Sequence, residues 1–313
     1  MKNGYLKILV NVVVLLTILI VFDLTIGWAG RKYMIWLNRK PRSGDAALVN
    51  YSLNAATPDV AIIGSSTAIC HYDPAIIHDS LMAYIGEDME VFNMGISNQR
   101  LAYDYYGLKC LLDRTTPKIV IADVWATYIG EGDPSFSFSA FRPHTHVNPN
   151  IKEMLKKHDE LDFMSKSNYY CFNTSLVKLI MSLLKSPAGN GFGKNTVEMT
   201  EVNKETEKDT TGLLPISIEE FDGMISLAKT NNVKLFVVMS PTLRSSDTTS
   251  MSYHYIKDKC SIEGIPFLDY SNSEKYYHPY YFFDRTHLNY YGAELFTQEL
   301  MKDIKKYIVL NQQ

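Results

Sequence analysis

The sequence has few cysteines and almost no excess of charge. Its four cysteines, Cys70, Cys110, Cys171 and Cys260, are far apart, and none belongs to a C-x-x-C pair. This spacing argues against a zinc site. A chain of 313 residues needs no disulfide scaffold, although one or two disulfides are compatible with it. A net charge of −3 and a pI near 6.2 give no indication of a nucleic-acid partner.

Signatures of metals and cofactors are also missing. Residues 189–193 are rich in glycine but lack the lysine and the flanking strand of a phosphate-binding loop. His144 and His146 lie close together without an Asp, Glu or Cys at ligand spacing, so we interpret them as surface residues of a loop. We therefore expect no metal and no cofactor.

One long apolar run is present, at the N-terminus. Residues 8–22 are nearly all apolar, and residues 24–29 continue the run past Asp23. About 20 such residues match the thickness of a bilayer, and the run is long for a cleaved secretory signal, which is the alternative. Aromatic and then basic residues typical of a membrane interface follow: Trp28, Tyr33, Trp36, Arg39, Lys40 and Arg42. We predict a transmembrane anchor at residues 1–30 and a juxtamembrane linker at residues 31–57. The basic residues do not decide the orientation.

Five short apolar runs predict β-strands, at residues 59–63, 91–94, 118–125, 235–239 and 266–270. Helical patterns alternate with them, at residues 99–112, 217–230, 253–263 and 291–307. This alternation predicts parallel βαβ units, and hence an α/β fold: a three-layer α/β/α sandwich with a five-stranded parallel sheet. The domain is expected to span residues 58–313. Residues 128–214 break the pattern and are interpreted as an insertion, with an amphipathic helix near 174–184 and a polar tract at 187–212.

Three loops carry residues with catalytic chemistry. Asp284 and His287 are spaced so that the carboxylate can orient the imidazole as a general base. Ser66 follows the first predicted strand, where a new helix begins and its N–H groups can stabilise an anion. Gly95 follows the second strand and can direct its N–H at an oxyanion. Each has a plainer alternative: a serine N-cap, a turn glycine, and a helix start with Asp284 as its cap.

Together, three blocks resemble the SGNH (GDSL-like) hydrolase superfamily: Gly64-Ser65-Ser66-Thr67, Asn93-Met94-Gly95-Ile96-Ser97 and Asp284-Arg285-Thr286-His287-Leu288-Asn289. The resemblance covers roughly residues 58–128 and 214–308. It implies a flavodoxin-like sheet, Ser66 as nucleophile, and His287 and Asp284 as its partners. It also implies that the N–H groups of Ser66 and Gly95 bind the oxyanion.

The third block of that family departs from its pattern here. Residues 124–127 are Val-Trp-Ala-Thr, without the asparagine that usually donates to the oxyanion. Asn98, another side chain, or nothing replaces it. The α/β-hydrolase fold, whose nucleophile elbow is close to Gly64-x-Ser66-x-Ala68, is disfavoured because Ser66 follows the first strand and the acid is adjacent to the histidine.

The resemblance is to membrane-anchored members that modify cell-surface polymers. It implies a serine esterase or O-acyltransferase acting on acyl, most simply acetyl, groups of a cell-envelope polysaccharide. The expected location is the bacterial cell membrane, single-pass, with the domain outside the cytoplasm. Partners would be the acylated or acceptor glycan and, in the transfer case, a membrane protein that delivers acyl groups; none would be a nucleic acid. The alternative is a catalytically inactive binding or assembly protein. Four tyrosines form either a sugar-stacking platform or ordinary packing: Tyr276, Tyr277, Tyr280 and Tyr281.

Overall fold

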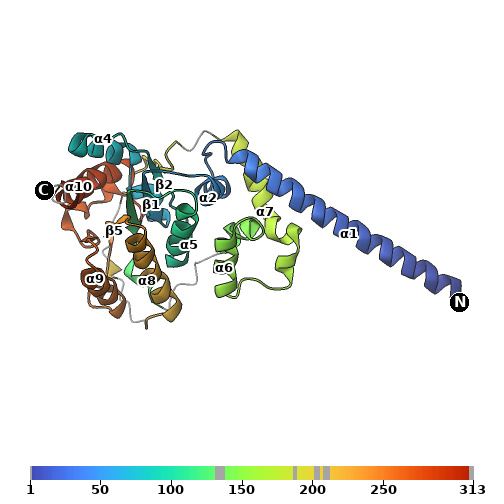
Figure 1. The fold of residues 1–313 in the computed structure, drawn as a ribbon. Helices are drawn as coiled ribbons and strands as arrows, with labels where there is room; N and C mark the ends of the chain where they lie inside the picture. The colour runs from blue at the N-terminus through green and yellow to red at the C-terminus, as the bar shows by residue number, and fades with distance from the viewer. Residues whose placement is uncertain (1, 131–137, 186–188, 201–204, 207–211, 310–313) are drawn as a thin grey trace.

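The computed structural model describes residues 2–130, 138–185, 189–200, 205–206 and 212–309 (Figure 1). Five parallel strands form one sheet in the order β2-β1-β3-β5-β7, which confirms the predicted sheet. The strands are β1 (Val60–Gly64), β2 (Val91–Asn93), β3 (Ile119–Asp123), β5 (Lys234–Met239) and β7 (Phe267–Asp269). All residues of β1 and β3 are buried, as expected for strands covered on both faces.

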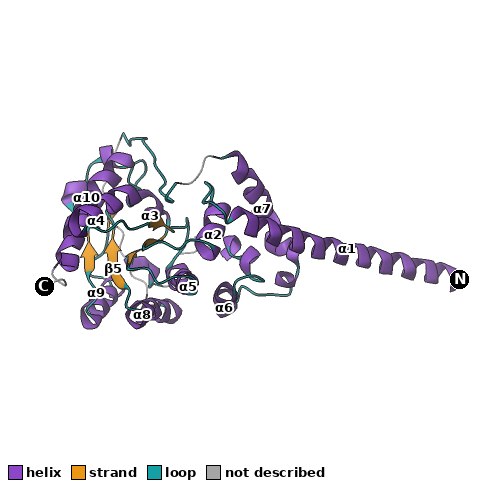
Figure 2. Cartoon of the chain, turned by 45° about the horizontal axis from the view of Figure 1, so that its top comes forward, coloured by secondary structure: helices purple, strands orange, loops and turns teal. Residues whose placement is uncertain are grey.

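Helices cover both faces of the sheet, as Figure 2 shows. One face packs against α3 (Ser66–His71), α4 (Pro74–Ile85) and α10 (Tyr290–Val309). The other packs against α5 (Leu101–Leu112), α8 (Pro215–Thr230) and α9 (Met251–Glu263). The three-layer α/β/α prediction is therefore confirmed. Helix α4 was not predicted from the sequence, although Asp73 caps it and Pro74 begins it, a typical helix start.

The strand order creates a topological switch point between β1 and β3. The chain passes from β1 to β2 on one side and then to β3 on the other. The register pairs Gly64 with Asp123, so the last residues of β1 and β3 lie at the same edge of the sheet. In open parallel sheets this is where ligands bind.

Residues 128–214, interpreted above as an insertion, contain mainly helices and short turns where the structure describes them. They contain α6 (Pro149–Lys157), α7 (Asn168–Met181) and short 3-10 turns, and they pack partly on α5. The helix predicted near 174–184 therefore starts earlier, and α6 was not expected. The turns inside this segment are η2 (Phe138–Ala140), η3 (Arg142–His144), η4 (Met164–Lys166) and η5 (Ser182–Leu184), and η1 (Ala126–Tyr128) leads into it from β3.

Parts of the tract at 187–212 lie outside the described residues; within it, β4 (Glu205–Thr206) pairs in parallel with β6 (Arg244–Ser245).

His144 was expected at the surface, but it is buried, and its Nδ1 lies 3.0 Å from Nδ2 of Asn54. Burial lowers the pKa of His144 to about 3. His146 is exposed, in agreement with the prediction.

The N-terminal region is one long helix followed by a short one. Helix α1 (Lys2–Leu37) projects from the body of the molecule (Figure 1). Within its stretch from Gly4 to Leu37, the most apolar window of 18 residues has a mean hydropathy of 2.7, and no residue of that window is buried. The stretch is therefore a candidate membrane span. Most of the linker expected at residues 31–57 is also helical: α1 continues to Leu37, and α2 spans Asp45–Asn54. Helix α2 buries Leu48, Val49 and Leu53 in the domain.

Candidate active site

The end of β1 forms a sharp turn that presents Ser66. Gly64 has a φ of 143°, a region that L-residues with side chains rarely adopt. A Cβ at Gly64 would also lie 2.9 Å from the carbonyl oxygen of Asp123, so only glycine fits there. Ser65 is the N-cap of α3, and Ser66 is its first residue, only partly buried.

Ser66, His287 and Asp284 form a hydrogen-bonded chain, although Ser66 is far from the other two in sequence. The Ser66 Oγ lies 2.7 Å from Nε2 of His287. On the other side of the ring, Nδ1 of His287 lies 2.8 Å from Oδ2 and 3.0 Å from Oδ1 of Asp284. The three residues that the sequence analysis selected are thus in contact, in the order required of a nucleophile, a base and its orienting acid.

The electrostatics of Asp284 determine which nitrogen of His287 carries the proton. Burial raises the pKa of Asp284, but hydrogen bonds from the His287 ring and from the backbone N–H groups of Thr286 and His287 outweigh it and lower this pKa to about 2. An ionised carboxylate only accepts hydrogen bonds, so Nδ1 of His287 must donate. In the neutral ring, Nε2 is then an acceptor aimed at the Ser66 hydroxyl.

The loop that carries Asp284 and His287 is a closed turn and not the first turn of a helix. A bridge between Phe282 and Leu288 closes it, and Asp284 Oδ1 accepts the N–H groups of Thr286 and His287 at 2.8 Å each. Helix α10 is capped instead by Asn289, whose Oδ1 accepts the N–H of Gly292 at 3.0 Å. The plainer interpretation of Asp284 as a helix cap is therefore wrong.

A second histidine, His71, supports this loop from the interior. Its Nε2 accepts the N–H of Leu288 at 2.9 Å, so Nδ1 carries the proton and donates to Ser240 Oγ at 2.8 Å. Burial, reinforced by His287, places the pKa of His71 well below its usual value, so the ring is neutral. His71 was not predicted from the sequence, because its role depends on a loop at the other end of the chain.

Asp123, at the end of β3, stabilises the turn that carries Ser66 through hydrogen bonds of its carboxylate. Its carboxylate accepts the hydroxyl of Thr67, the hydroxyl of Tyr72 at 2.7 Å and the N–H of Ser240 at 3.3 Å. Burial raises the pKa of Asp123, and these hydrogen bonds oppose the shift. The carboxylate thus ties the residue after Ser66 to the neighbouring strands. The sequence feature that could have identified Asp123 as a site residue is its position at the end of an apolar strand rich in branched residues.

The block after β2 also contributes structure. Asn93 donates from Nδ2 to the carbonyl of Ala68 at 2.6 Å, and its Oδ1 accepts the N–H of Gly95 at 3.0 Å. The Gly95 N–H, predicted to bind an oxyanion, therefore points to Asn93 in this structure. Asn93 joins the turn after β2 to α3.

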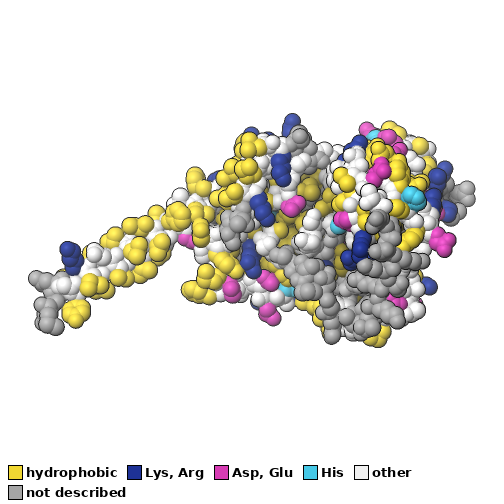
Figure 3. All heavy atoms as spheres, turned by 180° about the vertical axis from the view of Figure 1, so that it is seen from behind, with side chains coloured by type: hydrophobic (Ala, Val, Ile, Leu, Met, Phe, Trp, Pro, Cys, Tyr) yellow, Lys and Arg dark blue, Asp and Glu magenta, His cyan; other side chains and the backbone are white. Residues whose placement is uncertain are grey.

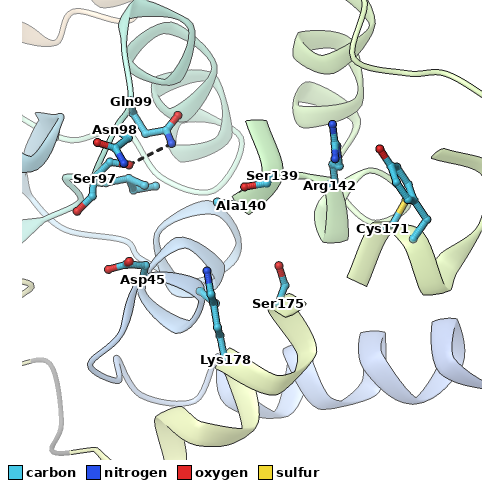
Figure 4. Close-up of a pocket in the computed structure, with 13 residues that line it drawn as sticks. Asp45, Ser97, Asn98, Gln99, Ser139, Ala140, Arg142, Cys171, Ser175 and Lys178 are labelled. Carbon is cyan, nitrogen blue, oxygen red and sulfur yellow. Dashed lines mark hydrogen bonds between the residues drawn. The ribbon is translucent and has the colours of Figure 1, made fainter. Parts of the chain in front are cut away.

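Asn98 was the candidate replacement for the missing asparagine of the third block. It is exposed and has a φ of 58°. It lines a cavity of about 160 Å³ between the loop after β2 and the insertion, in which Figure 4 shows Asp45, Arg142 and Lys178 on the facing elements. Ser66 does not line this cavity. This placement gives no support to Asn98 as an oxyanion donor.

Burial raises the pKa of all four cysteines, so their thiols are poor nucleophiles at neutral pH. The four cysteines are unpaired, and burial together with Asp284 raises the pKa of Cys70 to about 12. Among the described residues, no group of three His, Cys, Asp or Glu side chains could hold a metal.

Of the four tyrosines before the loop, Tyr276 is buried and its hydroxyl donates to Glu299, whereas Tyr280 is exposed and stacks on Tyr291.

No protein-family model matches the sequence, and no curated protein matches it. Solved structures with similar architecture include an acylhydrolase from Bacteroides fragilis, 12% identical, covering 83% of this chain and 94% of its own, with a TM-score of 0.38. A lipase/acylhydrolase from Enterococcus faecalis is 13% identical, covering 79% of this chain and 96% of its own, with a TM-score of 0.36. An acetyl xylan esterase is 10% identical, covering 80% and 99%, with a TM-score of 0.39. All three sequence identities are low.

Proposed function

We propose that the protein is a serine esterase or O-acyltransferase that acts on acyl esters, most simply acetyl esters, of a cell-envelope polysaccharide. The observation that carries the proposal is the chain from Ser66 through His287 to Asp284, with contacts of 2.7 and 2.8 Å. Such a chain activates a hydroxyl for attack on a carbonyl carbon. The apolar α1 supports action on a substrate tethered at or near a membrane.

The reaction follows from the protonation states of the site. As the Ser66 oxygen bonds to the ester carbonyl carbon, His287 Nε2 takes the hydroxyl proton, and Asp284 stabilises the imidazolium. When the tetrahedral intermediate collapses, the bond to the leaving alcohol breaks and His287 returns the proton to that alcohol. Water or a sugar hydroxyl then attacks the acyl carbon while His287 Nε2 takes its proton. The bond between the Ser66 oxygen and the acyl carbon breaks, and His287 returns the proton to Ser66. The first acceptor gives an esterase and the second an acyltransferase.

The oxyanion would be held first by the N–H of Ser66, in the opening turn of α3. The Gly95 N–H becomes a second donor only if it leaves Asn93. Absence of one donor typically costs roughly 3 kcal/mol of transition-state stabilisation, which slows acyl transfer without preventing it.

The missing third-block asparagine also motivates an alternative, an inactive protein that binds or assembles surface polysaccharide. The two candidates differ in turnover of p-nitrophenyl acetate by the full chain in detergent. The enzyme hypothesis expects turnover that is lost in Ser66→Ala and kept in Ser65→Ala, a matched neighbour. Absence of turnover in the unsubstituted chain, with retained binding of an acetylated glycan, would favour the alternative. Adding a glycan acceptor and measuring acetyl transfer against acetate release separates the two enzyme classes.

A further inference from the structure

Three large apolar side chains are exposed at the start of α7 and in the short turn η4 that precedes it. Phe163 is 79% exposed, Met164 50% and Tyr169 61%. We call these three residues the α7 patch. Exposed apolar side chains gathered in this way commonly mark a binding surface. Figure 3 shows hydrophobic side chains continuing from α1 onto the adjoining part of the body.

Helix α7 lies along the second half of α1 and runs in the same direction. Asn168 at its start contacts Gly27, and a Cβ added to Gly27 would lie 2.2 Å from the Asn168 side chain. Phe172 similarly fills the space beside Gly30, and farther along the hydroxyl of Tyr33 bonds the carbonyl of Leu179. These contacts determine which residues of α7 lie beside which residues of α1.

Asp23, the carboxylate inside the apolar stretch of α1, caps α7. It accepts the N–H of Asn168 at 3.0 Å, the N–H of Tyr169 at 2.9 Å and the hydroxyl of Ser167 at 2.6 Å. Backbone N–H groups at a helix start are costly to bury in lipid unless they have partners. Here the anchor helix itself supplies the partner, so the start of α7 can approach hydrocarbon.

The length of α1 before Asp23 sets the position of the patch. Residues 4–22 include Lys7, whose long side chain can extend to the headgroups, and they rise roughly 28 Å at 1.5 Å per residue, close to the ~30 Å thickness of a hydrocarbon core. Asp23 then lies at the edge of the bilayer. The Tyr169 ring, with its centroid 6.2 Å from that of Phe22, lies at this edge too. Trp28, 62% exposed one turn farther on, is typical of the same interface.

We propose that the α7 patch enters the interface of the bilayer into which α1 inserts, as a second membrane contact. The continuity with α1 favours lipid over another protein as the occupant. So does Lys166, whose Nζ lies 5.4 Å from the Phe163 ring centroid and can reach lipid headgroups. The contact would hold the domain in one orientation on the membrane. This inference depends on α1 as the anchor and does not depend on the catalytic role of Ser66.

The test uses the full chain in liposomes of phosphatidylcholine and phosphatidylglycerol. A nitrobenzoxadiazole fluorophore is attached at Phe163→Cys, Leu184→Cys or Leu15→Cys, and phosphatidylcholine bearing an acyl-chain nitroxide is the quencher. Leu184 is the matched control, because it is 80% exposed but lies beyond the other end of α7, roughly 24 Å farther along. Leu15 reports insertion of α1. The unsubstituted chain, labelled in parallel, gives the background from native thiols.

We expect fluorescence loss at position 15 with deep and shallow nitroxides, at position 163 mainly with the shallow one, and little loss at position 184. Quenching at 15 without quenching at 163, or equal quenching at 163 and 184, would overturn the proposal. So would a label at 163 that is shielded from both lipid nitroxide and aqueous iodide, since a second protein chain would then cover the patch. No quenching at 15 would overturn it by removing the anchor. Hydrolysis of p-nitrophenyl acetate by these variants tests the proposed activity separately.

Discussion

Replacement of Asp284 by asparagine should separate the fold of the site from its chemistry. Asp284 Oδ1 holds two backbone N–H groups at 2.8 Å, while Oδ2 is the closer oxygen to His287 Nδ1, at 2.8 Å. In Asp284→Asn, the amide oxygen can keep the backbone contacts, which places the NH2 group against Nδ1. The ring must then carry its proton on Nε2, facing Ser66, where it cannot accept the hydroxyl proton.

The expected loss is large because the base is then in the wrong tautomer. The corresponding change in a serine protease triad lowers kcat by about 10⁴. For Asp284→Asn we expect a 10³–10⁴-fold decrease in kcat for p-nitrophenyl acetate, about 4–5 kcal/mol of barrier. The melting temperature should change little, because the turn keeps its hydrogen bonds.

Asp79→Asn is the matched control, because Asp79 also bonds a histidine, His78, at 2.9 Å, but on the exposed surface of α4. It should retain full kcat. The reasoning would be refuted if Asp284→Asn kept kcat within a few-fold of the unsubstituted chain, or if its activity fell only in proportion to unfolded protein.

Three further changes test the supporting structure. Gly64→Ala should lower stability by about 1–3 kcal/mol in chemical denaturation, through its positive φ and backbone contact, whereas Gly86→Ala, also at positive φ but in open space, should cost less. His71→Phe leaves the N–H of Leu288 without its acceptor, so we expect about 1–3 kcal/mol of destabilisation and a lower kcat at similar KM; unchanged kcat would contradict its positioning role. The pKa of His144 is about 3 in the folded protein, below its value in the unfolded chain. The unfolding free energy is therefore unaffected by this residue above pH ~6.5 and falls as the pH is lowered toward 3, because the unfolded chain binds the proton first. His144→Gln should therefore reduce the slope of unfolding free energy between pH 6 and 4 by about 1.4 kcal/mol per pH unit, and an unchanged slope would refute that origin.

The sheet was predictable because its central strands are short buried runs that are almost entirely apolar. Residues 60–64, 119–123 and 235–239 show this pattern most clearly, since a strand covered on both faces buries nearly all of its side chains. The pairing of Ser66 with His287 was predicted because the three sequence blocks together resemble the SGNH (GDSL-like) hydrolase superfamily, and the two side chains are in contact. Neither inference required knowledge of side-chain packing.

The parts that were missed depend on contacts between distant segments. The burial of His144 depends on Asn54 in α2, and the role of His71 depends on Leu288. The helix at residues 45–54 follows a basic, polar stretch, and its stability comes from packing on α5. Asp23 looked like an interruption of an apolar run, and only the position of α7 explains it. Local sequence patterns do not contain such information.

The central claim is that Ser66 is a nucleophile activated by His287, and covalent labelling tests it most directly. The full chain is treated with a fluorophosphonate, digested, and the modified residue located by mass spectrometry. We expect one adduct on Ser66, absent in Ser66→Ala and formed far more slowly in His287→Gln. An adduct on Ser65, an equal rate in His287→Gln, or no adduct in the unsubstituted folded chain would contradict it.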